Sequence, residues 1–269
     1  MAAAAGEAHL KSSASSPRKS DPILFILHQE RSTAGRIGQI LAARGYAFDV
    51  RRPRFGNPLP PTMARHAGAI IFGGPMSAND DEEYIRREID WLAVPLAENK
   101  PFLGVCLGAQ MLVRHLGGKV ASHPQGQVEI GYYPIRPTPA GRALCPTWPQ
   151  RLYQWHREGM DLPSGSELLA EGETFPVQAF RHGSGYGLQF HPEITHAMMC
   201  RWLARGAQPL SLPGAQPWPA HFEDRAVHDV AIRAWLKDFL EQWIAPPTAG
   251  RGETRAHSPR GSGNQEGRP

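Results

Sequence analysis

Short apolar runs alternate with amphipathic segments over the first half of the chain. The apolar runs are bounded by polar or turn-forming residues, as buried strands are, and cover residues 22–27, 48–50, 69–72 and 102–105. Segments typical of helices lie at residues 34–44, 82–99 and 107–116. This order predicts an α/β fold with a doubly wound, mostly parallel central sheet. Pro95 is expected to kink or end its helix early.

The second half of the chain changes character, because helical periods are absent between residues 119 and 190. Strand-like runs separated by turn signals lie at residues 128–135, 151–155, 167–170, 177–180 and 186–190. We expect antiparallel strands added to the parallel sheet. The glycine-rich residues 182–187 lie between two strands and open no helix, so they predict a hairpin turn and not a dinucleotide-binding loop. A last amphipathic helix is expected over residues 230–243.

Composition and charge set the class of protein. Apolar residues make up 41% and charged residues 20%, the balance of a globular protein, and one domain is expected over residues 21–245. Residues 1–20 and 246–269 carry no apolar period, so both tails are expected to be disordered. The net charge of +4 comes from scattered residues, which predicts no nucleic-acid partner. No apolar run approaches the roughly 18 residues of a membrane span, which predicts no membrane partner.

The cysteines exclude several kinds of site. Cys106, Cys145 and Cys200 are too few and too widely spaced for a disulfide framework or for a CxxC metal or redox motif. A cytoplasmic protein without a metal or another cofactor is therefore expected. Cys145 lies in a proline-rich loop and Cys200 in an expected helix, where both thiols favour a structural interpretation.

Cys106 has a different context. It is the centre of Gly104-Val105-Cys106-Leu107-Gly108, where an expected strand gives way to an expected helix. This is the pattern of a nucleophile elbow with cysteine in the serine position. The flanking glycines leave room for a tight turn, and the helix N-terminus favours a reactive thiolate. The amide of Leu107 is then a candidate oxyanion donor. The same short pattern also fits an inert cysteine in a buried strand.

A cysteine nucleophile needs a base, and the base needs an orienting group. His191 follows an expected strand, and Glu193 lies two residues on, so both share one face of an extended segment. Another expected strand ends at Gly73-Gly74-Pro75, where the Gly74 amide is a candidate second oxyanion donor. Each piece alone also fits an ordinary strand end. Together they point to one site, because ligands of open α/β sheets bind at the carboxyl ends of the strands.

Three motifs in this order resemble those of the class I, triad-type glutamine amidotransferases. They are FGGPMS at residues 72–77, GVCLGAQ at residues 104–110 and QFHPE at residues 189–193. The resemblance covers about residues 23–193 and implies the flavodoxin-like architecture of that family. Within the family, the chain most resembles the stand-alone branch that is similar to the amidotransferase domain of GMP synthase.

The resemblance implies roles for individual residues. Cys106 would be the nucleophile, His191 the base and Glu193 its orienting partner, with Gly74 and Leu107 as oxyanion donors. The expected substrate-binding residues are Gly73, Gln110, Ile130, Gly131 and Tyr132. The segment from residue 153 to residue 156 would lie near the mouth of the pocket.

Three functions remain open from the sequence. The first is a glutaminase that hydrolyses the side-chain amide of glutamine through a cysteine thioester and supplies ammonia to a separate synthase, since only about 50 residues of the expected domain follow Glu193. The second is a γ-glutamyl peptidase acting on glutathione-like substrates, for which Arg31 and an expected loop at residues 154–157 are candidates to contact the leaving group. The third is a non-catalytic homologue that binds a partner. The intact Cys106, His191 and Glu193 argue against the third.

Overall fold

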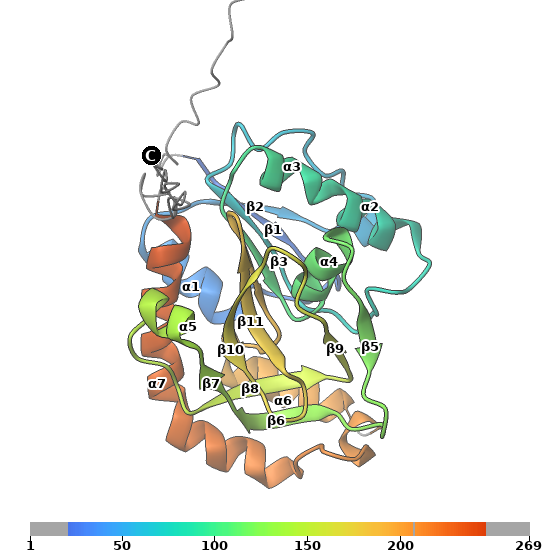
Figure 1. Cartoon of the computed structure of the whole chain (residues 1–269), viewed down its shortest axis with the longest axis vertical. Coiled ribbons are helices and arrows are strands. Elements are labelled where there is room, and N and C mark those ends of the chain that lie inside the picture. Colours follow the sequence, from blue (N-terminus) through green and yellow to red (C-terminus); the bar gives the residue numbers. More distant parts are fainter. Residues whose placement is uncertain (1–20, 207, 246–269) are drawn as a thin grey trace, which may run out of the picture.

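The computed structural model describes residues 21–206 and 208–245, and its centre is an eight-stranded mixed sheet (Figure 1). The expected tails at residues 1–20 and 246–269 lie outside the described residues. The strand order is β2-β1-β3-β4-β12-β11-β10-β7. The parallel strands are β1 (Ile23–Ile26), β2 (Phe48–Arg51), β3 (Gly68–Ile71), β4 (Phe102–Val105) and β12 (Gly185–Leu188). The antiparallel strands are β11 (Val177–His182), β10 (Glu167–Glu171) and β7 (Arg136–Pro137). The predicted fold class is confirmed.

Helices cover both faces of the sheet because successive side chains of a strand point to opposite faces. In β1, Ile23 and Phe25 join one apolar core, and Leu24 and Ile26 join the other. The first core packs under α1 (Gly35–Ala43) and α7 (Trp218–Ile244), which lie side by side in Figure 1. The second core packs under α2 (Glu83–Trp91), α3 (Ala93–Ala97) and α4 (Leu107–His115). Burial on both faces explains why these strands are continuous apolar runs.

Two helices differ from the expected bounds. The helix expected over residues 82–99 is split at Leu92, which ends α2 and begins α3. Pro95 lies in the first turn of α3, where its missing N–H removes no helical hydrogen bond. The last helix begins at Trp218, twelve residues before the expected start at residue 230. Its early turns carry few buried side chains, so apolar periodicity does not mark them.

The middle of the chain is only partly added to the main sheet. The hairpin of β11 and β12 turns at Gly183, with φ of 57°, as predicted, but β12 runs parallel to β4. Two further pairs form separate small sheets: β5 (Val120–Ser122) with β9 (Glu158–Met160), and β6 (Glu129–Pro134) with β8 (Arg151–His156). The expected strands at residues 128–135 and 151–155 therefore pair with each other instead of joining the central sheet, and β5 and β9 were not expected from the sequence.

Short helical elements complete the chain. α5 (Pro139–Leu144) lies in the region expected to lack helices, and the Thr138 hydroxyl caps it by accepting from the Gly141 amide at 3.1 Å. α6 (His196–Arg205) contains Cys200, as expected. The 3₁₀ turns are η1 (Pro53–Phe55) and η2 (Pro209–Ser211).

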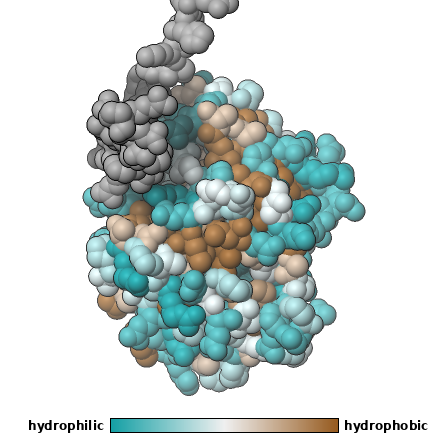
Figure 2. All heavy atoms as spheres, viewed as in Figure 1, coloured by the Kyte–Doolittle hydropathy of each residue, from teal (hydrophilic) through white to brown (hydrophobic). Residues whose placement is uncertain are grey.

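One face of the molecule, drawn in Figure 2, is mostly hydrophilic, with apolar side chains gathered near its centre. Within residues 21–206 and 208–245, no helix combines the length and the apolar character needed to cross a membrane.

Candidate active site

The carboxyl ends of four adjacent parallel strands bring three predicted pieces together with His28, which was not predicted. His28 follows β1, Gly73 follows β3, Cys106 follows β4 and His191 follows β12. Because these strands are parallel neighbours, their carboxyl ends lie at one edge of the sheet. The site is therefore built on the most buried part of the fold, where backbone positions are fixed by hydrogen bonds on both sides.

Cys106 is held in a backbone conformation that side chains rarely adopt. Its φ and ψ are 51° and −105°, and among the described residues Asn99 is the only other non-glycine residue with a positive φ. The Cys106 amide donates to the Leu188 carbonyl at 2.7 Å, and the Cys106 carbonyl accepts from the first turn of α4. Such strain costs about 1–3 kcal/mol and persists where the surrounding structure imposes it. The strand-to-helix elbow has the expected form.

The glycines on either side of the elbow are required by packing. A Cβ at Gly104 would overlap the backbone of Gly108, and a Cβ at Gly108 would overlap the backbone of Ile71. Any larger residue at either position would therefore push α4 away from β3 and β4. The spacing seen in the sequence reflects this close approach of helix and sheet.

His191 and Glu193 form a buried hydrogen-bonded pair. Nδ1 of His191 lies 2.8 Å from Oε1 of Glu193, and the two side chains are 4% and 3% exposed. The Glu193 carbonyl accepts from the Arg36 amide at 2.8 Å, which ties this segment to the start of α1. A Cβ at Gly73 would lie 2.7 Å from Cε1 of His191 and 3.5 Å from Cβ of Cys106. The structure thus brings Cys106, His191 and the Gly73 loop together.

The charge on His191 follows from its surroundings. Burial lowers the pKa of His191, but the Glu193 carboxylate and the Cys106 thiolate oppose burial and raise this pKa from 6.5 to about 10. The imidazolium therefore persists at neutral pH, where it can pair with a Cys106 thiolate and donate a proton.

We expect the pH profile of the reaction to carry this signature. Because the pKa of His191 is raised, the proton-donating form is kept at neutral pH and lost as the pH rises through about 10. A kcat/KM profile between pH 6 and pH 11, for the amide hydrolysis that the family resemblance implies, should fall on its alkaline side near pH 10. An alkaline fall centred near pH 6.5, with the fold intact by circular dichroism, would contradict this assignment.

The two candidate oxyanion donors are available. In the part of the chain that the structure describes, neither the Gly74 nor the Leu107 amide donates a backbone hydrogen bond. Leu107 is the first residue of α4, whose leading N–H groups have no helical acceptor. Both amides can therefore donate to a developing oxyanion.

A buried pair beneath the Gly73 loop orients one of these amides. Nδ1 of His28 lies 3.3 Å from the Gly73 carbonyl oxygen, and Nε2 lies 2.9 Å from Oε2 of Glu88, with both side chains 0% exposed. The Gly73 carbonyl and the Gly74 N–H belong to one planar peptide unit and point in opposite directions. Anchoring the carbonyl on His28 therefore aims the Gly74 N–H away from the core.

Removing this anchor should slow the chemical step. We expect His28→Leu to lower kcat about tenfold or more with little change in KM, since misaiming an oxyanion donor weakens only the transition state. His28→Asn keeps a donor near the position of Nδ1 and should recover part of the loss. Thermal unfolding of both variants is measured as well. If His28→Leu and His28→Asn had equal kcat values, His28 would contribute to packing only.

The expected substrate-binding residues behave differently from the triad. Ile130 and Tyr132 are buried in β6, and the Gln216 side chain accepts from the Tyr132 amide and donates to the Tyr132 carbonyl, both at 2.9 Å. A Cβ at Gly131 would overlap the same Gln216 side chain. Contact of Ile130, Gly131 and Tyr132 with a substrate stays a prediction of the resemblance.

Gln110 lies inside the protein below the nucleophile. Its side-chain amide donates to the Glu158 carbonyl at 2.9 Å and to Oε1 of Gln189 at 3.3 Å. The Gln189 amide lies 3.8 Å from the Cys106 sulfur. Gln110 therefore supports the residue that touches the nucleophile, and its contact with a substrate also stays a prediction.

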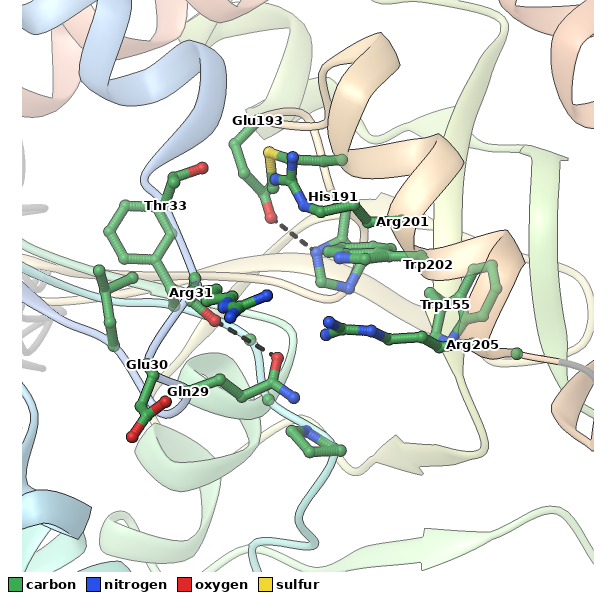
Figure 3. Close-up of a pocket in the computed structure, with 18 of the residues that line it drawn as sticks. Gln29, Glu30, Arg31, Thr33, Trp155, His191, Glu193, Arg201, Trp202 and Arg205 are labelled. Atoms are coloured by element: carbon green, nitrogen blue, oxygen red, sulfur yellow. Dashed lines mark hydrogen bonds and ion pairs between the residues drawn. The ribbon is translucent and has the colours of Figure 1, made fainter.

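A cavity of about 600 Å³ opens beside this cluster (Figure 3). Gly73, Gly74, His191 and Glu193 belong to its lining, whereas Gln110 and the three β6 residues do not. The Trp155 and Trp202 rings form an apolar wall, and Trp202 packs edge-on against His191 with centroids 4.8 Å apart.

The expected loop at residues 154–157 is a wrong prediction, because Gln154–His156 form the end of β8. Trp155 reaches the cavity from this strand, whereas the Gln154 side chain is buried and donates to Gln178 at 2.6 Å. Arg31, the other candidate, lines the cavity, and its contact with a leaving group stays a prediction.

Three residues beside the site were not expected from the sequence. His28 could have been found, since it directly follows a parallel strand. Gln189 could have been found within QFHPE. Trp202 carries no local signal, because only the packing of α6 against β8 brings it to His191.

The other two cysteines differ from Cys106. Burial, with a smaller contribution from Asp238, raises the pKa of Cys145 to about 12. Cys200 lies half-buried on α6. Within the described ranges, no group of three or more His, Cys, Asp or Glu side chains has the arrangement of a metal site.

A family profile and several known proteins are similar to this chain in sequence. The profile described as "Glutamine amidotransferase class-I" matches residues 31–206. The glutamine amidotransferase-like protein YfeJ of Salmonella typhimurium is 31% identical over 181 residues, which cover 64% of this chain and 75% of YfeJ. One subunit of the glutamine-hydrolysing GMP synthase of Thermococcus kodakarensis is 40% identical over 108 residues, which cover 36% of this chain and 53% of that relative.

Solved structures agree with the sequence matches. A glutamine amidotransferase from Methylobacillus flagellatus superposes with a TM-score of 0.77 at 26% identity, covering 89% of this chain and 100% of that one. A glutamine amidotransferase from Thermotoga maritima superposes with a TM-score of 0.76 at 26% identity, covering 84% and 99%. The chain belongs to the class I glutamine amidotransferase family.

Proposed function

We propose that this chain hydrolyses an amide at the γ-carbonyl of a glutamyl group, with Cys106 as nucleophile. The observation that carries this proposal is the elbow that holds Cys106 next to the buried His191–Glu193 pair. Its first candidate substrate is glutamine, with ammonia passed to a separate synthase. The similarity to a GMP synthase subunit supports such a partner.

The residues divide the reaction into two steps. The Cys106 thiolate attacks the γ-carbonyl, the Gly74 and Leu107 amides hold the oxyanion, and His191 protonates the nitrogen as the C–N bond breaks. In the resulting thioester the sulfur carries no charge, so one cause of the raised His191 pKa is lost. His191 can then accept a proton from water, which hydrolyses the thioester and releases glutamate.

Selective alkylation tests the nucleophile. A diazo-ketone analogue of glutamine should label Cys106 at least about tenfold faster than Cys145 or Cys200, because a thiolate reacts and a buried thiol with a raised pKa does not. The measurement is peptide mass spectrometry over time, and excess glutamine should protect Cys106. Label found mainly on Cys145 or Cys200 would overturn the assignment.

A γ-glutamyl peptidase is the second candidate, and the size of the cavity favours it. A volume of about 600 Å³ is within the usual range for a small-molecule site and far exceeds the needs of ammonia. Glutaminase and peptidase share the acyl half of the reaction and differ in the leaving group. A preference of about a hundredfold in kcat/KM, roughly 2.7 kcal/mol, for γ-glutamyl peptides over glutamine would identify the peptidase as the main activity.

A further inference from the structure

Positive charge gathers in the cavity beside His191. The lining includes four arginines and two glutamates: Arg31, Arg54, Arg201, Arg205, Glu30 and Glu193. Glu193 is already paired with His191. In Figure 3 the Glu30 carboxylate points away from the centre of the cavity. The arginines are therefore not balanced by the acidic residues around them.

Two of these arginines face each other. The guanidinium groups of Arg31 and Arg205 extend toward one another from opposite walls (Figure 3). Across the described residues, Arg31, Arg201 and Arg205 take part in no salt bridge. Like charges facing each other repel, and an anion between them replaces repulsion by attraction. A carboxylate suits this position, because a guanidinium group binds it through two parallel hydrogen bonds.

The position of the cavity beside His191 indicates that the leaving group of the substrate would occupy it. The leaving nitrogen takes its proton from His191, so the group attached to that nitrogen must lie beside the imidazole. Gly73, Gly74 and His191 line the cavity. The other four residues expected to bind the substrate, Gln110, Ile130, Gly131 and Tyr132, do not line it. The tryptophan wall offers an apolar surface to the part of the leaving group between nitrogen and carboxylate.

We propose that Arg31 and Arg205 bind a carboxylate on the leaving group. The preferred substrate is then a γ-glutamyl conjugate of an amine that carries a carboxylate, such as an amino acid. This inference rests on the proposed γ-glutamyl hydrolysis. The C–N bond of γ-Glu–NH–R breaks as the Cys106 thioester forms, and H₂N–R leaves with the His191 proton. Water then releases glutamate, so one amide and one water give two products without an oxidant.

Two matched substrates test the subsite. γ-Glutamyl-alanine carries the carboxylate, and γ-glutamyl-alaninamide has nearly the same shape without the charge. We expect the wild type to favour the acid by about tenfold or more in kcat/KM, a factor that corresponds to about 1.4 kcal/mol. This ratio should fall about tenfold in Arg205→Ala and in Arg31→Ala. Arg65→Ala removes an exposed arginine that does not line the cavity, and it should keep the wild-type ratio.

A binding measurement separates this inference from the proposed chemistry. Calorimetry with Cys106→Ala should show the same preference for the acid over the amide, because binding needs no turnover. Turnover of both substrates at equal kcat/KM would overturn the subsite and leave the hydrolysis standing. Equal losses for acid, amide and glutamine in Arg205→Ala would also overturn it, since the arginine would then bind the common glutamyl half. If the wild type bound the acid more tightly than the amide but hydrolysed neither, the proposed hydrolysis would be wrong and the carboxylate subsite would stand.

Discussion

Replacing Cys106 by alanine is expected to lower kcat for γ-glutamyl amide hydrolysis by at least about 10⁴-fold, because no other group at the elbow can form the thioester. The side chain is small and 5% exposed, so the fold should survive the change. Cys106→Ser should be almost as inactive, since an alcohol ionises far less readily than a thiol. Steady-state assays of released glutamate with each purified variant measure the effect.

The other cysteines provide the controls for this prediction. Cys200→Ala removes a half-buried thiol from α6 and should keep the wild-type rate. Cys145→Ala is the control for removing a buried thiol elsewhere, because Cys145 lies in the core that packs against α7. Wild-type turnover by Cys106→Ala would show that the activity comes from another residue or from a contaminant, whereas a wild type without turnover would favour the non-catalytic homologue.

Replacing His191 by alanine is expected to lower kcat by about 10³-fold or more, because the thiolate loses its cation and the leaving nitrogen loses its proton donor. Glu193→Ala should cost less, since water can take part of the orienting role. Both losses are measured as kcat, and the alkaline fall of kcat/KM near pH 10 should disappear in the His191 variant.

A rival histidine makes this prediction specific. Nε2 of His156 lies 3.1 Å from Oε2 of Glu129, so a further buried His–Glu pair exists at β6 and β8. His191, however, lies with Cys106 around Gly73, where a Cβ would be 2.7 Å from Cε1 of His191 and 3.5 Å from Cβ of Cys106. If His191→Ala kept its activity and His156→Ala lost it, His156 and not His191 would be the catalytic histidine.

The central sheet was predictable because its strands are buried on both faces and read as separate apolar runs. Local patterns also located the elbow at Cys106, since the glycines are required by the approach of α4 to β3. The first half of α7 was missed because few of its side chains are buried. The two small sheets were missed because alternation along a strand does not specify its partner.

The candidate site was predictable only where sequence neighbours carry it. Glu193 follows His191 by two residues, so their pairing could be expected from an extended backbone. The pairing of His28 with Glu88 spans 60 residues and depends on the packing of α2 against the sheet. The facing of Arg31 and Arg205 joins the loop after β1 to the end of α6, and no local pattern links these two segments.

Trapping the acyl-enzyme shows directly whether Cys106 carries the γ-glutamyl group during turnover. The reaction of the wild type with a γ-glutamyl substrate is quenched in acid during turnover, and the protein is digested and analysed by mass spectrometry. We expect one γ-glutamyl group on the peptide that contains Cys106. Hydroxylamine should release this group, as it cleaves a thioester, and the group should be absent from Cys106→Ala. A γ-glutamyl adduct on another residue, or steady turnover by Cys106→Ala, would contradict the proposed role of Cys106.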